Sequence, residues 1–100
     1  MALKMAYSAR ARLDLHWFRI YCETQFPEGM PKANARFSKC LALLSMTPNM
    51  GRPAGKEPRR RFSVPNTPYT ILYQVNGDLL EVARVLDQRS ENYLQDLFDP

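Results

Sequence analysis

Residues 69–87, YTILYQVNGDLLEVARVLD, decide the fold because two apolar runs flank one strong turn signal. The dipeptide Asn76-Gly77 is that signal, since both residues tolerate the positive φ of a two-residue type I′ turn. Apolar residues occupy every second position before it: Ile71, Tyr73 and Val75. This two-residue period predicts an antiparallel β-hairpin with one buried face.

The position of the turn also predicts how the two strands face each other. It pairs Val75 with Asp78, Tyr73 with Leu80, Ile71 with Val82, and Tyr69 with Arg84. The apolar pairs share one face, which we expect to lie against helices. The opposite face is half apolar, so we expect something to cover it; its apolar members are Leu72, Ala83 and Val85.

A third alternating stretch precedes the hairpin. Phe62 and Val64 alternate with Arg61 and Ser63, which is typical of a strand. Pro65 follows and cannot donate a ladder hydrogen bond, so this strand is predicted to lie at an edge or to end early.

The N-terminal half has helical spacing after one short strand. Residues 3–7, LKMAY, alternate as a strand, and the Ser8 hydroxyl oxygen is a predicted helix cap. A helix is predicted from Ala9 to near Phe26, with its apolar face at Ala9, Leu13, Trp17, Ile20 and Tyr21. A second helix is predicted from about Pro31 to Thr47, with an apolar stripe at Ala33, Phe37, Cys40, Leu41 and Leu44.

The residues NYLQDLF at 92–98 predict a short C-terminal helix, which is a candidate cover for the second sheet face. Its apolar side would carry Tyr93, Leu94, Leu97 and Phe98. The predicted order is a strand, a helical hairpin and a three-stranded antiparallel meander, with the N-terminal strand joining the same sheet. This order predicts an α+β fold with helices packed on one face, in a single domain over residues 1–100.

The composition favours a folded domain with a basic surface. Hydrophobic residues make up 45% of the 100 residues, which suffices for a core. A chain of this size buries only about two thirds of its unfolded surface, so we expect any site to be a shallow groove. The net charge is +4 although the last ten residues contain three acids and no base, so the rest of the chain favours an acidic partner.

Few residues have the spacing of a reactive site. Cys22 and Cys40 lack disulfide or metal spacing and are predicted to be buried thiols. His16 is the only histidine, and phosphate loops, nucleophile elbows and metal-ligand motifs are missing, so we expect no metal, no cofactor and no conventional hydrolase mechanism. No run approaches the roughly 20 apolar residues of a membrane span, so we expect a cytoplasmic protein without a membrane partner.

Four segments, in order along the chain, resemble the ParE/RelE superfamily of bacterial toxins. They are DL in the first predicted helix, TPNMGRP after the second, RRRFSVPNTPYTILYQV, and LLEVARVLDQR. The resemblance runs from Tyr7 to about Tyr93. It implies a toxin of a type II toxin–antitoxin module, associated with plasmid stabilisation and growth arrest, that a cognate antitoxin wraps and holds inactive in a hetero-oligomer.

The resemblance leaves three functions open. ParE-type members poison DNA gyrase without cleaving RNA. RelE-type members cut messenger RNA on the ribosome, with basic side chains that polarise the phosphate and a tyrosine or other group as acid or base. A degenerate member would bind its antitoxin only as a non-toxic regulator.

Residue matching favours the ParE type. RelE-type ribonucleases have a basic residue after the tyrosine that starts the YxxxY strand, where this chain has Thr70. They have two alternating lysines on the preceding strand, where this chain has Arg61 and Ser63. Many relatives also have a histidine where Asp87 stands, and an acidic residue there would oppose a phosphate.

We therefore expect an inhibitor of DNA gyrase with no catalytic residue assigned. The residues expected to bind the target or the antitoxin are Arg59, Arg60, Arg61, Leu72, Arg84 and Arg89, with Leu72 in the half-apolar face that would receive the antitoxin. The alternative is a ribosome-dependent mRNA endoribonuclease, in which RSENY at 89–93 resembles the RelE segment that supplies an arginine and a tyrosine. Its catalytic set would be Arg61, Arg89 and Tyr93.

Overall fold

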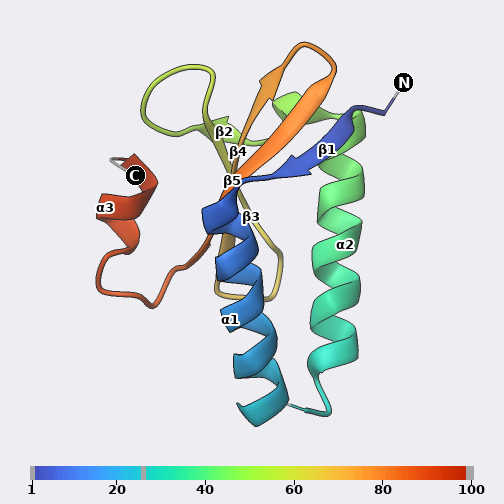
Figure 1. Cartoon of the computed structure of the whole chain (residues 1–100), viewed down its shortest axis with the longest axis vertical. Helices are drawn as coiled ribbons and strands as arrows, with labels where there is room; N and C mark the ends of the chain where they lie inside the picture. Colours follow the sequence, from blue (N-terminus) through green and yellow to red (C-terminus); the bar gives the residue numbers. More distant parts are fainter. Residues whose placement is uncertain (1, 26, 99–100) are drawn as a thin grey trace.

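The computed structural model describes residues 2–25 and 27–98 and has the predicted α+β architecture (Figure 1). The elements in chain order are β1 (Lys4–Tyr7), α1 (Ala9–Gln25), α2 (Met30–Met46), the 3-10 turn η1 (Pro48–Met50), β2 (Arg52–Pro53), β3 (Arg60–Ser63), β4 (Tyr69–Asn76), β5 (Leu79–Asp87) and α3 (Tyr93–Phe98). Within these described residues, every helix is too short or too polar to cross a membrane.

One sheet holds all five strands, in the order β1-β5-β4-β3-β2. β1 runs parallel to β5, whereas β3, β4 and β5 form the predicted antiparallel meander. β2 was not predicted; its two residues pair with β3 and make β2 the edge of the sheet. β3 ends at Ser63, shortly before Pro65, as the missing proline donor predicts.

The turn between β4 and β5 lies one residue later than predicted. Asn76 belongs to β4, and the turn residues are Gly77 and Asp78. Gly77 has φ +63°, and among the described residues the only non-glycine with positive φ is Asn66. In a type II′ turn only the first of the two central residues has positive φ, and Gly77 is that residue here. The predicted pairs Val75–Asp78, Tyr73–Leu80, Ile71–Val82 and Tyr69–Arg84 are therefore wrong, and the observed partners include Asn76–Leu79, Val75–Leu80 and Tyr73–Val82.

A β-bulge in β5 changes which residues face α1 and α2. The register shifts between Leu72 and Tyr73 because Ala83 is an extra residue without a partner in β4. One extra residue reverses the alternation that follows it, so Val85 packs in the core beneath α1 and α2, and Leu86 packs on the opposite face. The prediction that placed Val85 on the opposite face was wrong, since no local sequence signal marks the bulge.

The Ser8 side chain attaches the start of α1 to β5 and so fixes the rotation of α1 about its axis. The Ser8 hydroxyl accepts a hydrogen bond from the Ala11 N–H at 3.0 Å, which caps the helix as predicted, and donates to the Ala83 carbonyl at 2.6 Å. The residues of α1 that this rotation buries are Ala11, Phe18 and Cys22.

The prediction that Leu13 and Trp17 belong to the buried face of α1 was wrong. Leu13 and Trp17 are 56% and 60% exposed, and Ile20 and Tyr21 are only half-buried. Apolar residues occur on more than one side of α1, and the buried side is the one with Ala11, Phe18 and Cys22.

α2 presents the stripe that its spacing predicts. Phe37, Cys40 and Leu44 are buried, and Ala33 and Leu41 are half-buried against the same core. Cys22 and Cys40 are free thiols in this core, and burial raises the pKa of each.

α3 covers the second face of the sheet, as the sequence predicted. Leu97 is fully buried in a second core with Ala54, Leu72 and Leu86. Tyr93 packs against this core, whereas Leu94 and Phe98 are mostly exposed. The sheet is therefore enclosed between the α1–α2 hairpin and α3 (Figure 1).

Candidate functional site

The arginine triplet at the start of β3 points to both faces of the sheet. Arg60 pairs with Tyr73 and donates from Nη1 to the Gly51 carbonyl at 2.7 Å. Arg61 points the other way, with its guanidinium carbon 5.9 Å from the centroid of the Phe98 ring. Arg59 precedes the strand, and its backbone is tied to the loop before it. The triplet therefore does not form one continuous basic face.

A row across the sheet brings three of the predicted residues together. Arg61 pairs with Leu72, and Leu72 pairs with Arg84. Arg52, which was not predicted, extends the row because it pairs with Arg61. Strands lie about 4.8 Å apart, so the Cα atoms of Arg61 and Arg84 are roughly 10 Å apart with Leu72 between them.

Leu72 does not form an open apolar patch. Its side chain is fully buried in the core that Leu97 of α3 completes. The prediction that this face receives a partner through Leu72 was therefore wrong for the observed conformation. The chain itself supplies the apolar cover that the half-apolar face needs.

Arg84 is held by an acid on α1. Its Nε and Nη2 donate to the two carboxylate oxygens of Asp14 at 2.8 and 3.2 Å, and the Val85 N–H donates to the same carboxylate at 2.9 Å. The hydrogen bonds from the Arg84 guanidinium to Asp14 raise the pKa of Arg84 above its usual value. Its third nitrogen, Nη1, is buried and has no hydrogen-bond partner among the described residues.

Arg89 lies apart from the arginine row. Its guanidinium donates to both carboxylate oxygens of Asp87 and lies 5.1 Å from the centroid of the Tyr21 ring on α1. Hydrogen bonds from Arg89 lower the pKa of Asp87, and those to Asp87 and Tyr21 raise the pKa of Arg89. Asp87 is therefore an ion-pair partner in this structure.

The residues of the ribonuclease alternative contact different partners. Arg61 lies against Phe98, and Arg89 lies against Asp87 and Tyr21. The Tyr93 hydroxyl shares a 3.0 Å hydrogen bond with the buried Thr70 hydroxyl, which also accepts from Gln88. Each of the three side chains thus has its own structural contacts.

A groove between α1, the end of β5 and α3 was missed from the sequence. It has a volume of about 280 Å³, and its lining includes Asp14, Trp17, Arg84, Asp87, Tyr93 and Asp96. These residues come from three segments far apart in the chain, so no local motif marks them. The sequence placed Trp17 on the predicted apolar face of α1, so its exposure was not predicted.

Comparisons with known proteins agree with this fold. A family model described as "ParE toxin of type II toxin-antitoxin system, parDE" matches residues 5–92. A solved structure described as "Chromosomal ParDE TA system from P. aeruginosa" superposes with a TM-score of 0.71 at 20% identity, over 86% of this chain and 96% of that chain. At this identity the likeness shows the fold alone. No curated protein sequence matches.

The family match runs from Met5 in β1 to Asn92, the residue before α3. The chain therefore belongs to the ParE toxin family of type II toxin–antitoxin systems.

Proposed function

We propose that this chain inhibits DNA gyrase and that a cognate antitoxin neutralises it by binding. Two observations support the proposal: the family match over residues 5–92 and the concentration of positive charge at one edge of the sheet. The protein would act in the bacterial cytoplasm by occupying its target, and no residue is assigned a covalent role.

The basic edge is the observation that carries the proposal. Residues 52–61 contain a single acid, Glu57, and five bases: Arg52, Lys56, Arg59, Arg60 and Arg61. Arg52 and Lys56 are exposed, and β2 is the edge of the sheet. Gyrase binds DNA during its reaction. Clustered arginine and lysine side chains attract such a polyanion and speed its association with the protein.

The hydrogen-bond partners of the possible catalytic residues support inhibition by binding. A general acid or base needs to lie within hydrogen-bond reach of the reacting group. The Tyr93 hydroxyl is bonded to Thr70, and the Arg89 guanidinium is bonded to Asp87. Both side chains already have partners that a phosphate would have to displace.

Supercoiling of relaxed plasmid by purified gyrase tests the target. We expect the chain to reduce supercoiling in proportion to its concentration. The double variant Arg52→Glu/Lys56→Glu should inhibit at least tenfold less, since it reverses exposed charge at the basic edge. The matched control is Lys32→Glu/Lys39→Glu, which makes the same charge change at exposed positions of α2 and should inhibit normally.

Three other outcomes would reject or redirect the proposal. Unchanged supercoiling at large toxin excess would reject gyrase as the target. Codon-spaced cuts in messages from induced cells, abolished by Tyr93→Phe, would support the ribosome-dependent ribonuclease. Harmless induction together with a stable antitoxin complex would indicate a non-toxic regulator.

The antitoxin part of the proposal has its own test. A sequence pI near 9.3 favours an acidic partner. Co-expression with the product of the adjoining reading frame should restore growth, and the two proteins should elute together from a sizing column. Separate elution, with growth still arrested, would contradict neutralisation by that partner.

A further inference from the structure

Two arginines of the basic edge lie side by side without an acid to neutralise them. Arg52 of β2 and Arg61 of β3 are Cα partners in the antiparallel ladder, so their side chains project from the same face of the sheet. Neither forms a salt bridge with the described residues. Like charges in directly opposite positions repel each other. An anion bound between the two guanidinium groups would relieve this repulsion.

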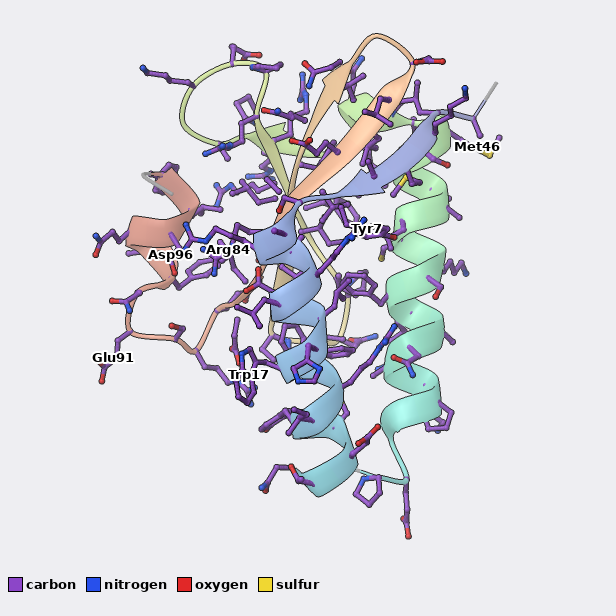
Figure 2. The ribbon with its side chains drawn as sticks, viewed as in Figure 1. Tyr7, Trp17, Met46, Arg84, Glu91 and Asp96 are labelled. Carbon is purple, nitrogen blue, oxygen red and sulfur yellow. The ribbon has the colours of Figure 1, made fainter. Side chains whose placement is uncertain are left out.

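The third arginine of the same row is already neutralised. Arg84 donates to both carboxylate oxygens of Asp14, and Figure 2 shows Arg84 between α1 and α3. The open positive charge of the row therefore lies at Arg52 and Arg61, where β2 ends the sheet.

The guanidinium of Arg61 is positioned by its neighbours but is still accessible. Its carbon lies 5.9 Å from the centroid of the Phe98 ring, and its Nε atom is buried without a hydrogen-bond partner. Its two terminal nitrogens make no hydrogen bond with the described residues and are not buried, so they can donate to a ligand. Arg52 beside it is exposed.

A groove at this edge, which we call the β2–β3 groove, opens beside the two arginines. It has a volume of about 350 Å³ and is lined by Met50, Gly51, Arg52, Arg61, Phe62 and Ser63. None of these lining residues is an acid. β2 pairs only with Arg60 and Arg61, so no strand of the described residues lies beside Phe62 and Ser63 on this side.

Ser63 supplies two further hydrogen-bond donors. It follows Arg61 by two positions in β3 and so faces the same side of the sheet. Its hydroxyl oxygen accepts from the Gln88 amide at 3.2 Å, which leaves the hydroxyl proton to donate. The Val64 N–H donates to Tyr69 of β4, and successive N–H groups of a strand point in opposite directions. The Ser63 N–H therefore points to the open edge.

The start of β2 is held firmly against the sheet. The Gly51 N–H donates to the Tyr73 hydroxyl at 3.0 Å, and the Gly51 carbonyl accepts from Arg60 Nη1 at 2.7 Å. A Cβ atom at this position would collide with the Tyr73 hydroxyl, so this close approach requires glycine. Arg52 therefore begins from a fixed backbone, and a rigid site loses less conformational entropy when it binds a ligand.

These donors suit a phosphate of a duplex backbone. Arginine presents a planar fork of donors that matches phosphate oxygens, and hydroxyl and backbone N–H groups are common phosphate donors. Lys56 and Arg59 extend the positive charge beyond the groove, which favours a polyanion over a single anion. Single strands also need exposed aromatic faces for their bases, whereas Phe62 in the lining is half-buried against the core.

We infer that the β2–β3 groove binds a backbone phosphate of duplex DNA directly, in the absence of gyrase. Arg52 and Arg61 donate to the phosphate from one side and Ser63 donates from the other, while Lys56 and Arg59 attract neighbouring phosphates. Phosphate contacts carry no sequence information, so the binding is independent of base sequence. This activity goes beyond gyrase inhibition, because the chain reaches DNA without the enzyme.

Fluorescence anisotropy of a short labelled DNA duplex, titrated with the full chain and without gyrase, tests the inference. We expect saturable binding that is the same for unrelated sequences and weakens as the salt concentration rises. Arg52→Gln/Arg61→Gln should weaken binding by about tenfold at low salt. It should also reduce the slope of log K against log salt by about two, one for each lost cation at the phosphate.

The matched control is Arg12→Gln/Arg19→Gln, which removes the same charge at exposed positions. These two arginines line a groove between α1 and α2, on the face of the sheet opposite to α3. The control should bind with nearly the affinity and the salt slope of the parent chain.

A second variant tests the site without removing an arginine. Ser63→Asp places a carboxylate beside Arg61 and should also weaken binding by about tenfold, because the carboxylate competes with the phosphate. Ser38→Asp is the same change at an exposed position of α2 and should bind normally. Near-ultraviolet circular dichroism verifies that all four variants keep the native fold.

The other outcomes decide against the inference or separate it from the proposed target. Equal weakening by the two arginine pairs would mean that binding follows net charge alone and would overturn the site. Tighter binding of the single strand or of polyglutamate would replace duplex DNA as the ligand. Absence of binding at low salt would reject the site even if supercoiling were inhibited. Binding without inhibition of supercoiling would support the site and reject gyrase as the target.

Discussion

The carboxylate of Asp14 joins α1 to β5 by accepting hydrogen bonds from the Arg84 guanidinium and from the backbone N–H of Val85. The side chains of Asp14 and Arg84 are only 16% and 13% exposed. Removing one partner of a buried ion pair typically costs about 3–5 kcal/mol, because the other charge stays buried without compensation.

Asp14→Ala should therefore lower the free energy of unfolding by about 3–5 kcal/mol in urea denaturation at neutral pH. Asp14→Asn should cost less, because its amide oxygen still accepts from the Val85 N–H. The exposed acid Glu91 provides a control, and Glu91→Ala should stay within about 0.5 kcal/mol of the parent. A loss for Asp14→Ala as small as that control would show that the pair does not hold α1.

The hydroxyl of Tyr73 connects the sheet to η1. It donates to the Pro48 carbonyl at 2.6 Å and accepts from the Gly51 N–H at 3.0 Å, and the side chain is fully buried. Tyr73→Phe should cost about 1–3 kcal/mol, since both backbone groups lose their partner. Tyr7→Phe is the control, because the Tyr7 hydroxyl makes no hydrogen bond with the described residues. Equal denaturation midpoints for the two variants would contradict the role of this hydroxyl.

Tyr69 should make the fold sensitive to alkali. Burial, with a smaller contribution from Asp87, raises the pKa of Tyr69 from 10.0 to about 12. In this interval the unfolded chain has already released the tyrosine proton and the folded chain has not, so rising pH favours unfolding. The resulting loss of stability is about 2–3 kcal/mol.

Urea denaturation at about pH 9 and about pH 11 measures about half of this loss, roughly 1.4 kcal/mol, because pH 11 lies only about one unit above the pKa of tyrosine in the unfolded chain. Burial also raises the pKa of Tyr7 and of Tyr73, so the parent chain is compared with Tyr69→Phe to isolate one group. The variant should lose less stability over the same interval. An identical pH dependence for both proteins would show that the protonation of Tyr69 is not linked to folding.

Leu97 should account for most of the packing energy of α3. It is fully buried against Leu72 and Leu86, whereas Leu94 on the same helix is 66% exposed. Leu97→Ala should lower the free energy of unfolding by about 2–5 kcal/mol. Leu94→Ala should change it by less than about 0.5 kcal/mol. Similar losses for the two variants would contradict the observed orientation of α3.

The elements were predictable where a local signal specifies them. The spacing of Phe37, Cys40 and Leu44 predicted α2 and its buried stripe, and the Ser8 hydroxyl predicted the start of α1. The two-residue alternation around Gly77 predicted the hairpin. These signals depend on neighbours within a few residues, so the sequence alone contains them.

The rotation of α1 and the bulge at Ala83 were not predictable in this way. α1 has apolar residues on more than one side, and only contact with β5 decides that Ala11 faces the sheet while Trp17 does not. The bulge follows from how β5 fits β4 over its whole length. Both features depend on packing between segments that are distant in the chain.

The candidate site was only partly predictable for the same reason. Composition indicated a basic surface, and Arg61 and Arg84 do fall in one row. The ion pair between Asp14 and Arg84 joins residues 70 positions apart, and no motif connects them. The groove and its acidic lining therefore became visible only in three dimensions.

The parallel pairing of β1 with β5 has a consequence for synthesis. Lys4 pairs with Leu79, so the partner of β1 leaves the ribosome only after most of the chain has been made. Until then β1 has no strand to pair with, and the ion pair between Arg84 of β5 and Asp14 of α1 cannot form. A translation product that stops before Leu79 therefore lacks the strand with which β1 pairs, and this sheet can be completed only when synthesis is nearly finished.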